Sequence, residues 1–285
     1  MVETAAANPE LLADQVANLL VQPLEAASVV LSSGVRIFDT AGVLRIPKLT
    51  GSSAVGFVGE GAEIPSDHDT TFDELVLMPT DRKSLKTIER YTNELVRQSV
   101  LGIDAVLKNR LVKVVGDKLD TELLKGTGAS AGITGITNQA GVQTGELDVT
   151  DADCLLDAIA LASAAEVTPS RWFVNGNDFI ELRKLKEATG SAKYLLESDV
   201  TAGPTYRLFG IGVTPTNKLP EGKAVLADTS QIAVARDIAP SVTILTERYA
   251  EFDQIGIRVT TRYDLGLLHP EAVVVLTAGS GGGTP

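Results

Sequence analysis

The sequence predicts an α+β fold in which a long helix and a long terminal strand form one unit and a central α/β region forms another. The helix is expected from Ser99 to Lys125, because apolar residues recur there at three- and four-residue steps. The strand is expected from Ile255 to Leu267, where mostly apolar residues alternate with polar residues or glycine. Between them, residues 131–240 alternate helical and strand-like segments, as an α/β unit does.

The composition is that of a globular chain with enough apolar residues, 44%, to bury a core. No stretch approaches the 18 or so uninterrupted apolar residues of a membrane helix. Acidic residues outnumber basic ones by 37 to 25 and the sequence shows no basic cluster. Both observations argue against a protein that binds nucleic acid tightly. Cys154 is the only cysteine, so no internal disulfide can form and a reducing compartment is expected.

The first part of the chain predicts an arm followed by a projecting hairpin. Residues Asn8 to Ser33 carry a helical rhythm of apolar residues, but the segment is too short to be a domain. Four short β-rich runs follow, at Val35–Phe38, Val43–Ile46, Val55–Val58 and Leu75–Met78. The polar tract Gly59–Thr71 separates the last two, as in a long hairpin. Such a ribbon is marginal alone and needs a partner surface.

The expected long helix ends at the glycines of Gly126–Gly128, and its polar positions separate the apolar ones. These polar positions are Asp104, Lys108, Lys113, Lys118 and Asp120. A second helix is expected after a cap at Asp151 or Asp153, and a third from Phe179 to Ala188. Further strands are expected at Trp172–Val174, Leu208–Val213, Ala224–Ala227 and Ala272–Leu276.

Five motifs, in this order along the chain, resemble those of the major capsid proteins of tailed bacteriophages, the Hong Kong 97 fold family. They are Ile64–Asp67 with Thr71–Phe72, Leu123–Gly128 with Gly135–Ile136, Phe173–Phe179 with the helix after it, Gly210–Val213 with Pro215 and Asp228, and His269–Val273. Each motif is weak alone, whereas five in the right order are specific. The resemblance extends over nearly the whole chain.

The resemblance implies a division into five parts. Residues 1–43 are expected to form an N-terminal arm with a first strand, and 44–83 an extended loop. A peripheral domain would combine residues 84–130, including the long helix 99–125, with residues 241–279. An axial α/β domain would span 131–240, and 280–285 would be a flexible tail.

The resemblance also implies a function, which is to self-assemble into the icosahedral head that encloses a double-stranded DNA genome. The expected partners are copies of the chain in hexamers and pentamers, a separate scaffolding protein, a portal and cement proteins. The chain would be assembled in the host cytoplasm and reside in the virion capsid, without cofactor, membrane contact or sequence-specific DNA binding. Contacts between subunits are expected at four apolar hairpin residues, Phe57, Val58, Phe72 and Leu75.

Two departures from the family pattern matter. The founding member of the fold joins subunits by an isopeptide bond that needs a loop Lys, an Asn and a Glu, but Ile64 stands here where that Lys would be. Neither Asn nor Glu occurs between Phe252 and Asp264, so no catalytic residue and no covalent crosslink are expected. The chain also lacks the long N-terminal scaffolding segment of some members, which predicts either a separate scaffolding protein or a processed N-terminus.

Alternatives remain open at this point. One is an encapsulin-like compartment shell that packages a cargo enzyme, and another, from a different class, is a soluble acidic enzyme that uses carboxylates. A metal site at Asp67–Asp69 with Asp73 and Glu74 is less favoured than a solvated acidic loop, so no metal is expected. The glycine-rich stretch Gly126–Gly132 follows a helix and not a strand, which favours a turn over a phosphate loop.

Overall fold

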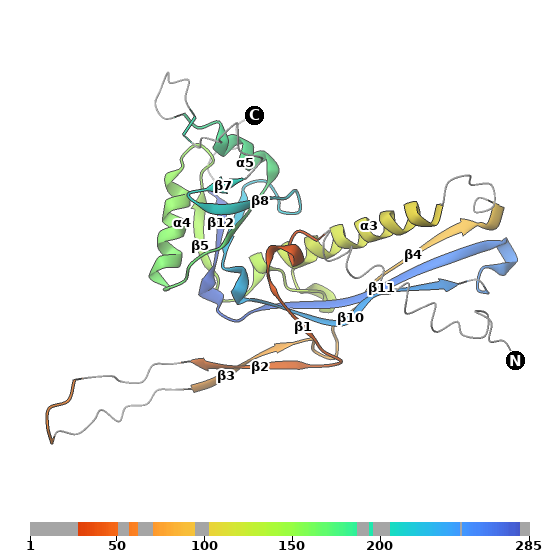
Figure 1. Ribbon diagram of the computed structural model, residues 1–285, viewed down its shortest axis with the longest axis horizontal. Helices are drawn as coiled ribbons and strands as arrows, with labels where there is room; N and C mark the ends of the chain where they lie inside the picture. The colour runs from red at the N-terminus through yellow and green to blue at the C-terminus, as the bar shows by residue number, and fades with distance from the viewer. Residues whose placement is uncertain are drawn as a thin grey trace, which may run out of the picture.

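The structure, a computed structural model, describes residues 28–50, 57–61, 71–94, 103–186, 194–195, 206–245 and 247–279. These residues form a four-stranded sheet, a six-stranded sheet and a two-stranded hairpin. Figure 1 shows that the two larger sheets lie at an angle to each other, whereas the hairpin projects away from both. The expected N-terminal arm and the C-terminal tail fall largely outside the described residues.

The four-stranded sheet has the order β1-β10-β11-β4, and the long helix α3 lies along it (Figure 1). Its strands are β1 (Arg36–Asp39), β10 (Ile232–Leu245), β11 (Gln254–Leu267) and β4 (Leu85–Thr92), and the helix is α3 (Ile103–Lys125). Strand β1 runs parallel to β10, whereas β11 pairs antiparallel with both β10 and β4. One core cluster fills the space between α3 and the sheet, built from residues such as Leu111, Val115, Val259 and Leu265.

The six-stranded sheet has the order β5-β12-β9-β6-β8-β7 and carries two helices. In this order its strands are Gln143–Leu147, Val273–Ala278, Lys223–Ala227, Arg171–Val174, Ile211–Pro215 and Arg207–Leu208, and the helices are α4 (Asp153–Ala164) and α5 (Gly176–Arg183). Short 3-10 turns complete the chain at Leu31–Ser33 (η2), Ala129–Ala131 (η3), Ile136–Asn138 (η4), Thr229–Gln231 (η5), Ala250–Phe252 (η6) and Pro270–Ala272 (η7).

The central strands of this sheet are buried on both faces. Trp172, Val174 and Leu226 point toward α4 and α5, while Phe173 and Val225, one residue along, belong to the core cluster beneath α3. Because successive side chains of a strand point to opposite faces, one strand can serve two cores. This explains the continuous apolar runs at Trp172–Val174 and Ala224–Ala227, which the sequence correctly indicated as strands.

The hairpin consists of β2 (Leu44–Thr50) and β3 (Thr71–Leu77), paired from Leu44 opposite Leu77 to Thr50 opposite Thr71. Of the expected strand Val55–Val58, the first two residues lie outside the described part. Phe57 and Val58 are described and do not belong to a strand.

Two elements differ from their expected bounds. The segment Leu208–Val213 forms two strands, because Phe209 and Gly210 adopt positive φ values of 49° and 83° and reverse the chain between β7 and β8. Helix α5 ends at Arg183 and does not continue to Ala188, and Lys186 instead pairs with Tyr194 in an isolated β-bridge.

The glycine that ends α3 is needed for close packing. A Cβ atom on Gly126 would stand 2.3 Å from the carbonyl oxygen of Ile133 and 2.5 Å from that of Glu122. Behind it, the Thr137 hydroxyl donates to the carbonyl of Leu124, and the Asn138 amide donates to that of Lys125 at 3.1 Å. The last carbonyl groups of the helix, which have no partner within it, are thereby satisfied.

Candidate functional site

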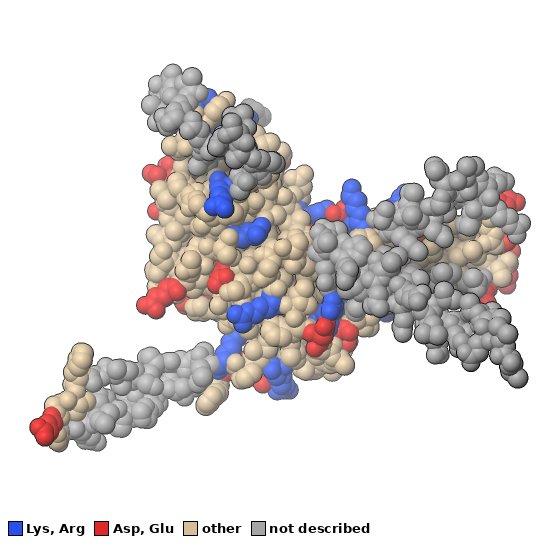
Figure 2. All heavy atoms as spheres, in the orientation of Figure 1, with Lys and Arg blue, Asp and Glu red and all other residues tan. Residues whose placement is uncertain are grey.

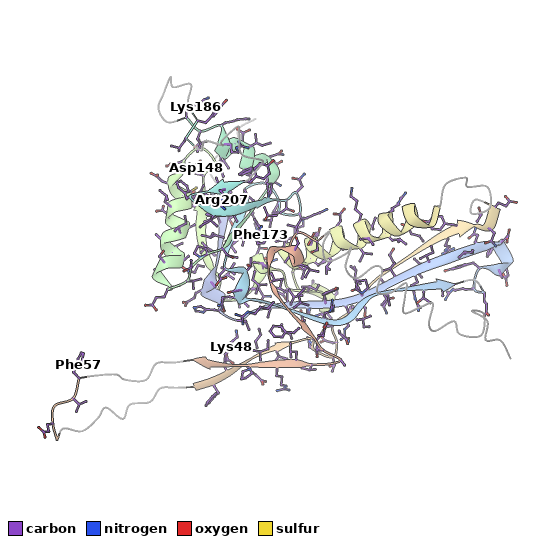
Figure 3. The ribbon with its side chains drawn as sticks, in the orientation of Figure 1. Lys48, Phe57, Asp148, Phe173, Lys186 and Arg207 are labelled. Atoms are coloured by element: carbon purple, nitrogen blue, oxygen red, sulfur yellow. The ribbon has the colours of Figure 1, made fainter. Side chains whose placement is uncertain are left out.

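The four residues expected at a subunit contact lie on the hairpin and differ in their surroundings. Phe57, at the tip and far from the body (Figure 3), is fully exposed, and Phe72 has 81% of its surface exposed. Val58 is 37% exposed. Leu75 is partly buried, because it packs on the cluster of Leu77, Met78 and neighbouring residues at the base of the hairpin. The structure therefore separates Leu75, at the hairpin root, from the three residues farther out.

The two faces of the hairpin have different chemistry. Leu44, Ile46 and Leu75 share the face that packs against the body. On the same face the Lys48 ammonium group donates to the carbonyl of Leu267 at 2.6 Å, and its burial lowers the pKa of Lys48. The opposite face carries the Arg45–Glu74 ion pair, at 2.7 Å, together with apolar surface. Its exposed apolar side chains are Phe72 and Val76.

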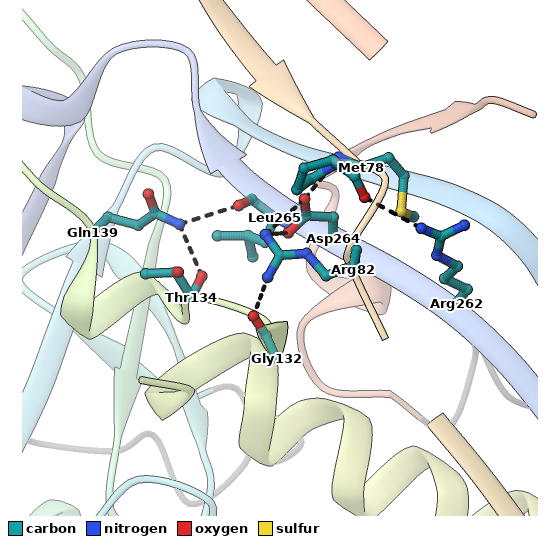
Figure 4. Close-up of polar contacts among 9 residues, drawn as sticks. Met78, Arg82, Gly132, Thr134, Gln139, Arg262, Asp264 and Leu265 are labelled. Carbon is teal, nitrogen blue, oxygen red and sulfur yellow. Dashed lines mark hydrogen bonds and ion pairs between the residues drawn. The ribbon is translucent and has the colours of Figure 1, made fainter. Parts of the chain in front are cut away.

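A buried carboxylate fastens the root of the hairpin to the long strand β11 (Figure 4). Asp264 is 1% exposed and accepts a hydrogen bond from the backbone amide of Met78, directly after β3, at 2.8 Å. Arg82 donates to the same carboxylate at 3.0 Å and also to the carbonyl of Gly132. Because an unpaired buried charge is very costly, this arrangement fixes where the chain leaves β3.

Two further side chains extend the contacts around Asp264 (Figure 4). Arg262 donates to the carboxylate of Asp237 on β10 at 2.7 Å and to the carbonyl of Pro79 at 3.2 Å. Gln139 donates to the carbonyl groups of Thr134 and Leu265. The segment after the hairpin, the two long strands and the turns after α3 are thus joined by polar contacts from their side chains.

Met78 adopts a backbone conformation that is unusual for a residue with a side chain, with φ at 58°. Such a conformation costs on the order of 1–3 kcal/mol, while a hydrogen bond to a charged group contributes about 1.5–3 kcal/mol. The hydrogen bond from Met78 to Asp264, together with burial of 99% of the Met78 surface, offsets this cost. The sharp change in chain direction after β3 is therefore held by tertiary contacts.

A second buried carboxylate, on α3, anchors the start of the described chain to this helix. Asp120, one of the polar positions that separate the apolar ones in the expected helix, is 2% exposed and accepts hydrogen bonds from the Ser28 hydroxyl and from the amides of Val29 and Val30. Burial raises the pKa of Asp120, and these hydrogen bonds oppose the rise. The adjacent Leu31 is also buried, so residues 28–31 belong to the core.

Polar residues of the motifs that resemble the capsid family form hydrogen bonds that stabilise turns and helix starts. Asn175 caps α5 by accepting a hydrogen bond from the Asn177 amide, and its own amide donates to the carbonyl of Leu219. Asp178 accepts from the Gly222 amide at 2.8 Å, and Asp228 caps η5 through Ser230. Neither expected cap of α4 is correct, because Ala152 stands at the cap position without a side-chain hydrogen bond, although Asp151 just before it accepts from the Asp153 amide.

In the described part of the chain, no group of three or more potential metal ligands occurs, and no helix is long and apolar enough to cross a membrane. The acidic run Asp67–Asp69 lies outside the described residues. In the view of Figure 2, Lys and Arg side chains are scattered among acidic and neutral residues and do not form a continuous basic face.

Comparison with known proteins gives one family. A family model described as the phage capsid family matches residues 10–278. The chain is also similar to the major capsid protein of Klebsiella oxytoca phage phiKO2, with 20% identity over 260 residues. This alignment covers 83% of the chain and 60% of that relative.

Solved structures share the fold across nearly the whole chain. The capsid of a native GTA particle matches with a TM-score of 0.73 and 16% identity, covering 88% of this chain and 90% of that one. A structure from Mycobacterium phage Bobi matches with a TM-score of 0.71 and 17% identity, covering 89% and 91%. The expected fold class, mixed helix and sheet in a phage capsid arrangement, is confirmed.

Substitution of the carboxylate at the hairpin root should be strongly destabilising. Asp264→Ala would leave the Arg82 guanidinium and the Met78 amide buried without their acceptor, at a cost of about 3–5 kcal/mol in the free energy of unfolding. Urea unfolding of the subunit measures this. Asp157→Ala, at an exposed position of α4, is the control and should change stability by less than about 0.5 kcal/mol. Similar stability of the two variants would contradict this role for Asp264.

The second buried carboxylate, that of Asp120, should make the free energy of unfolding depend on pH. Because the folded-state pKa of Asp120 lies above the ordinary value of 3.8, the folded state binds the proton more tightly than the unfolded state. The free energy of unfolding should therefore fall as the pH rises from 3.8 through the raised pKa, and this contribution should then level off. Urea unfolding across that range should show a smaller fall for Asp120→Asn. An identical pH profile for the two proteins would show that Asp120 does not contribute.

Proposed function

The chain belongs to the phage capsid family, and from this premise we propose that it is the subunit that builds the shell of a phage head. The observation that carries the proposal is the projecting hairpin, whose root is fixed by the body while its outer part exposes Phe57 and Phe72. Exposed aromatic side chains on an anchored arm are suited to burial on another molecule. Neighbouring copies of the same chain are the partners that shell assembly would supply.

The mechanism of assembly that we infer is geometric. A projecting arm that meets a different surface on the next copy makes a heterologous contact, and such contacts close into rings when the rotation between copies permits it. Rings of six and five subunits would then join into an icosahedral shell. Each contact can be modest, because many contacts per subunit act together once the first has formed.

The family also suggests partners and a place. A separate scaffolding protein would guide assembly, a portal would occupy one vertex, and cement proteins would bind the finished shell, all in the host cytoplasm. The enclosed DNA would not be gripped tightly or by sequence. The net charge of −12 and the scattered basic side chains of Figure 2 support a lining that lets a polyanion be packed and released.

The division into parts expected from the sequence needs two adjustments. Strand β10 runs across residue 240, where the axial domain was expected to end, and lies entirely in the four-stranded sheet. Strand β12, expected in the peripheral domain, lies in the six-stranded sheet. We therefore propose a peripheral domain of residues 84–130 and 232–268 and an axial domain of 131–231 and 269–279.

The two alternatives are disfavoured to different degrees. The soluble acidic enzyme has no support, because the family that matches is one of structural proteins. An encapsulin-like compartment would use a shell of the same fold, but the relatives and solved structures described above are capsids of phages or of a GTA particle. No observation on the described residues favours a cargo-binding compartment.

Truncation of the tip should impair assembly without destabilising the subunit. Phe57→Ser removes a ring that is fully exposed in the subunit, so the thermal midpoint of the isolated chain should stay unchanged while particle yield, counted by electron microscopy, falls. Leu75→Ser is the matched comparison, because Leu75 packs on its own subunit and its loss should lower the thermal midpoint. Normal particle yield from Phe57→Ser would contradict the assembly role of the tip.

Covalent joining of subunits is not expected. Ile64, which replaces the lysine required for an isopeptide bond, lies outside the described residues, and the prediction rests on the sequence alone. Assembled particles boiled in denaturing detergent should release a single band near 30.0 kDa. A ladder of multimers that survives boiling and reducing agent would mean that other residues form the crosslink.

A further inference from the structure

Two arginines and a glycine lie side by side on three neighbouring strands of the six-stranded sheet. Gly212 on β8 pairs with Arg171 on β6 and, on its other side, with Arg207 on β7, the outermost strand (Figure 3). Residues that pair across neighbouring strands direct their side chains to the same face of a sheet. Since neighbouring strands lie about 4.8 Å apart, the two arginine side chains start roughly 10 Å apart, with no side chain between them.

This group faces away from α4 and α5. The next residues along the three strands, Trp172, Leu208 and Val213, or the residue before in the case of no strand, belong to the core cluster beneath those helices. Because successive side chains of a strand alternate between faces, the arginines and the glycine lie on the opposite face. The core beneath α3 covers that face farther along the sheet, whereas here Arg207 is exposed and Arg171 is half-buried.

Gly212 leaves an open space between the two arginines. A glycine inside a strand weakens the strand, and it often marks a bulge, a bend or a place where another backbone or a ligand comes close. Gly212 pairs in regular register on both sides and has no positive φ, so neither a bulge nor a turn explains it. A Cβ atom on Gly212 would have no described atom within 4 Å. Within the described part of the chain, nothing occupies the space above this glycine.

The two guanidinium groups carry charge that no described carboxylate neutralises. Arg171 donates to the Thr214 hydroxyl at 3.0 Å, which positions its side chain without pairing its charge. Neither Arg171 nor Arg207 forms an ion pair among the described residues. A guanidinium group presents a planar fork of donors that matches the oxygens of a phosphate group. Two such charges favour a doubly negative ligand over a single carboxylate.

We propose that Arg171 and Arg207 form an anion site over Gly212 that binds a phosphate group. Each guanidinium fork would donate to oxygens of the ligand, and the missing side chain at Gly212 would let the ligand approach the sheet. The phosphate can come from a compact free anion such as pyrophosphate or from a nucleic acid backbone. A compact anion fits better, because tight binding of a polyanion needs many basic residues and the chain has a net charge of −12. This site goes beyond shell building and does not depend on it.

Titration of the full chain with pyrophosphate, followed by isothermal calorimetry in phosphate-free buffer, tests the site. We expect saturable binding that Arg207→Gln weakens at least about tenfold, because the variant removes charge-assisted hydrogen bonds to the ligand. The matched control is Arg248→Gln, at an exposed arginine before η6 in another part of the chain, and it should bind as the unsubstituted chain does. No saturable binding, or equal affinity of Arg207→Gln and Arg248→Gln, would overturn the site.

A second variant fills the space and keeps both charges. Gly212→Val should be accommodated by the strand, because the added Cβ meets no described atom within 4 Å and valine favours strands. The thermal midpoint should therefore not fall, while the affinity for pyrophosphate should drop at least about tenfold as the side chain keeps the ligand from the arginines. Unchanged affinity in Gly212→Val would show that the anion does not bind over this glycine.

A short DNA duplex in the same titration, at physiological salt, distinguishes the two sources of phosphate. We expect the duplex to bind more weakly than pyrophosphate, because two arginines contact too few backbone phosphates to hold it. Tighter binding of the duplex than of pyrophosphate, lost in Arg207→Gln, would overturn the assignment to a compact anion and identify the site as a nucleic-acid contact.

Discussion

The arrangement of this molecule depends on one buried carboxylate, that of Asp264 on the long strand β11. It accepts hydrogen bonds from the amide of Met78 and the guanidinium of Arg82, and so fixes the direction of the chain where it leaves the hairpin. A two-stranded ribbon has little surface to bury and would not keep one direction by itself. With its root fixed, the ribbon presents the same apolar tip in every copy, as the proposed contact between copies would require.

The same strand explains how one chain can support two sheets and a projecting arm. Near its end, β11 is buried on both faces: Tyr263, Leu265 and Leu267 belong to the core beneath α3, whereas a Cβ on Gly266 would stand 2.7 Å from Leu77 of the hairpin. The alternation along this strand, which is typical of a strand with one buried face, therefore describes only its first part correctly. Tertiary contacts, and not the periodicity of the strand, decide which faces are covered.

Helices and strands with a strict apolar periodicity were predicted from the sequence, whereas strands with an irregular pattern were missed. The long helix and β11 were found because their apolar residues repeat at helical and strand spacing, although α3 is described only from Ile103. Strand β10 was missed because Asp237 and Pro240 interrupt its pattern, and its pairing with β11 indeed shifts register around these residues. Strand β4 was missed because, as an edge strand, it carries Lys86, Glu89 and Arg90 among few apolar residues.

The exposed hairpin residues could be predicted because they lacked a core of their own, whereas Asp264 could not, because a polar residue in an alternating strand suggests a solvent-facing side chain. The tip should become buried only on assembly, and hydroxyl-radical footprinting of Phe57 measures this burial. We expect rapid oxidation of the ring in free subunits, where it is fully exposed, and strong protection in assembled particles. Equal oxidation of Phe57 in the two states would show that the tip is not covered on assembly.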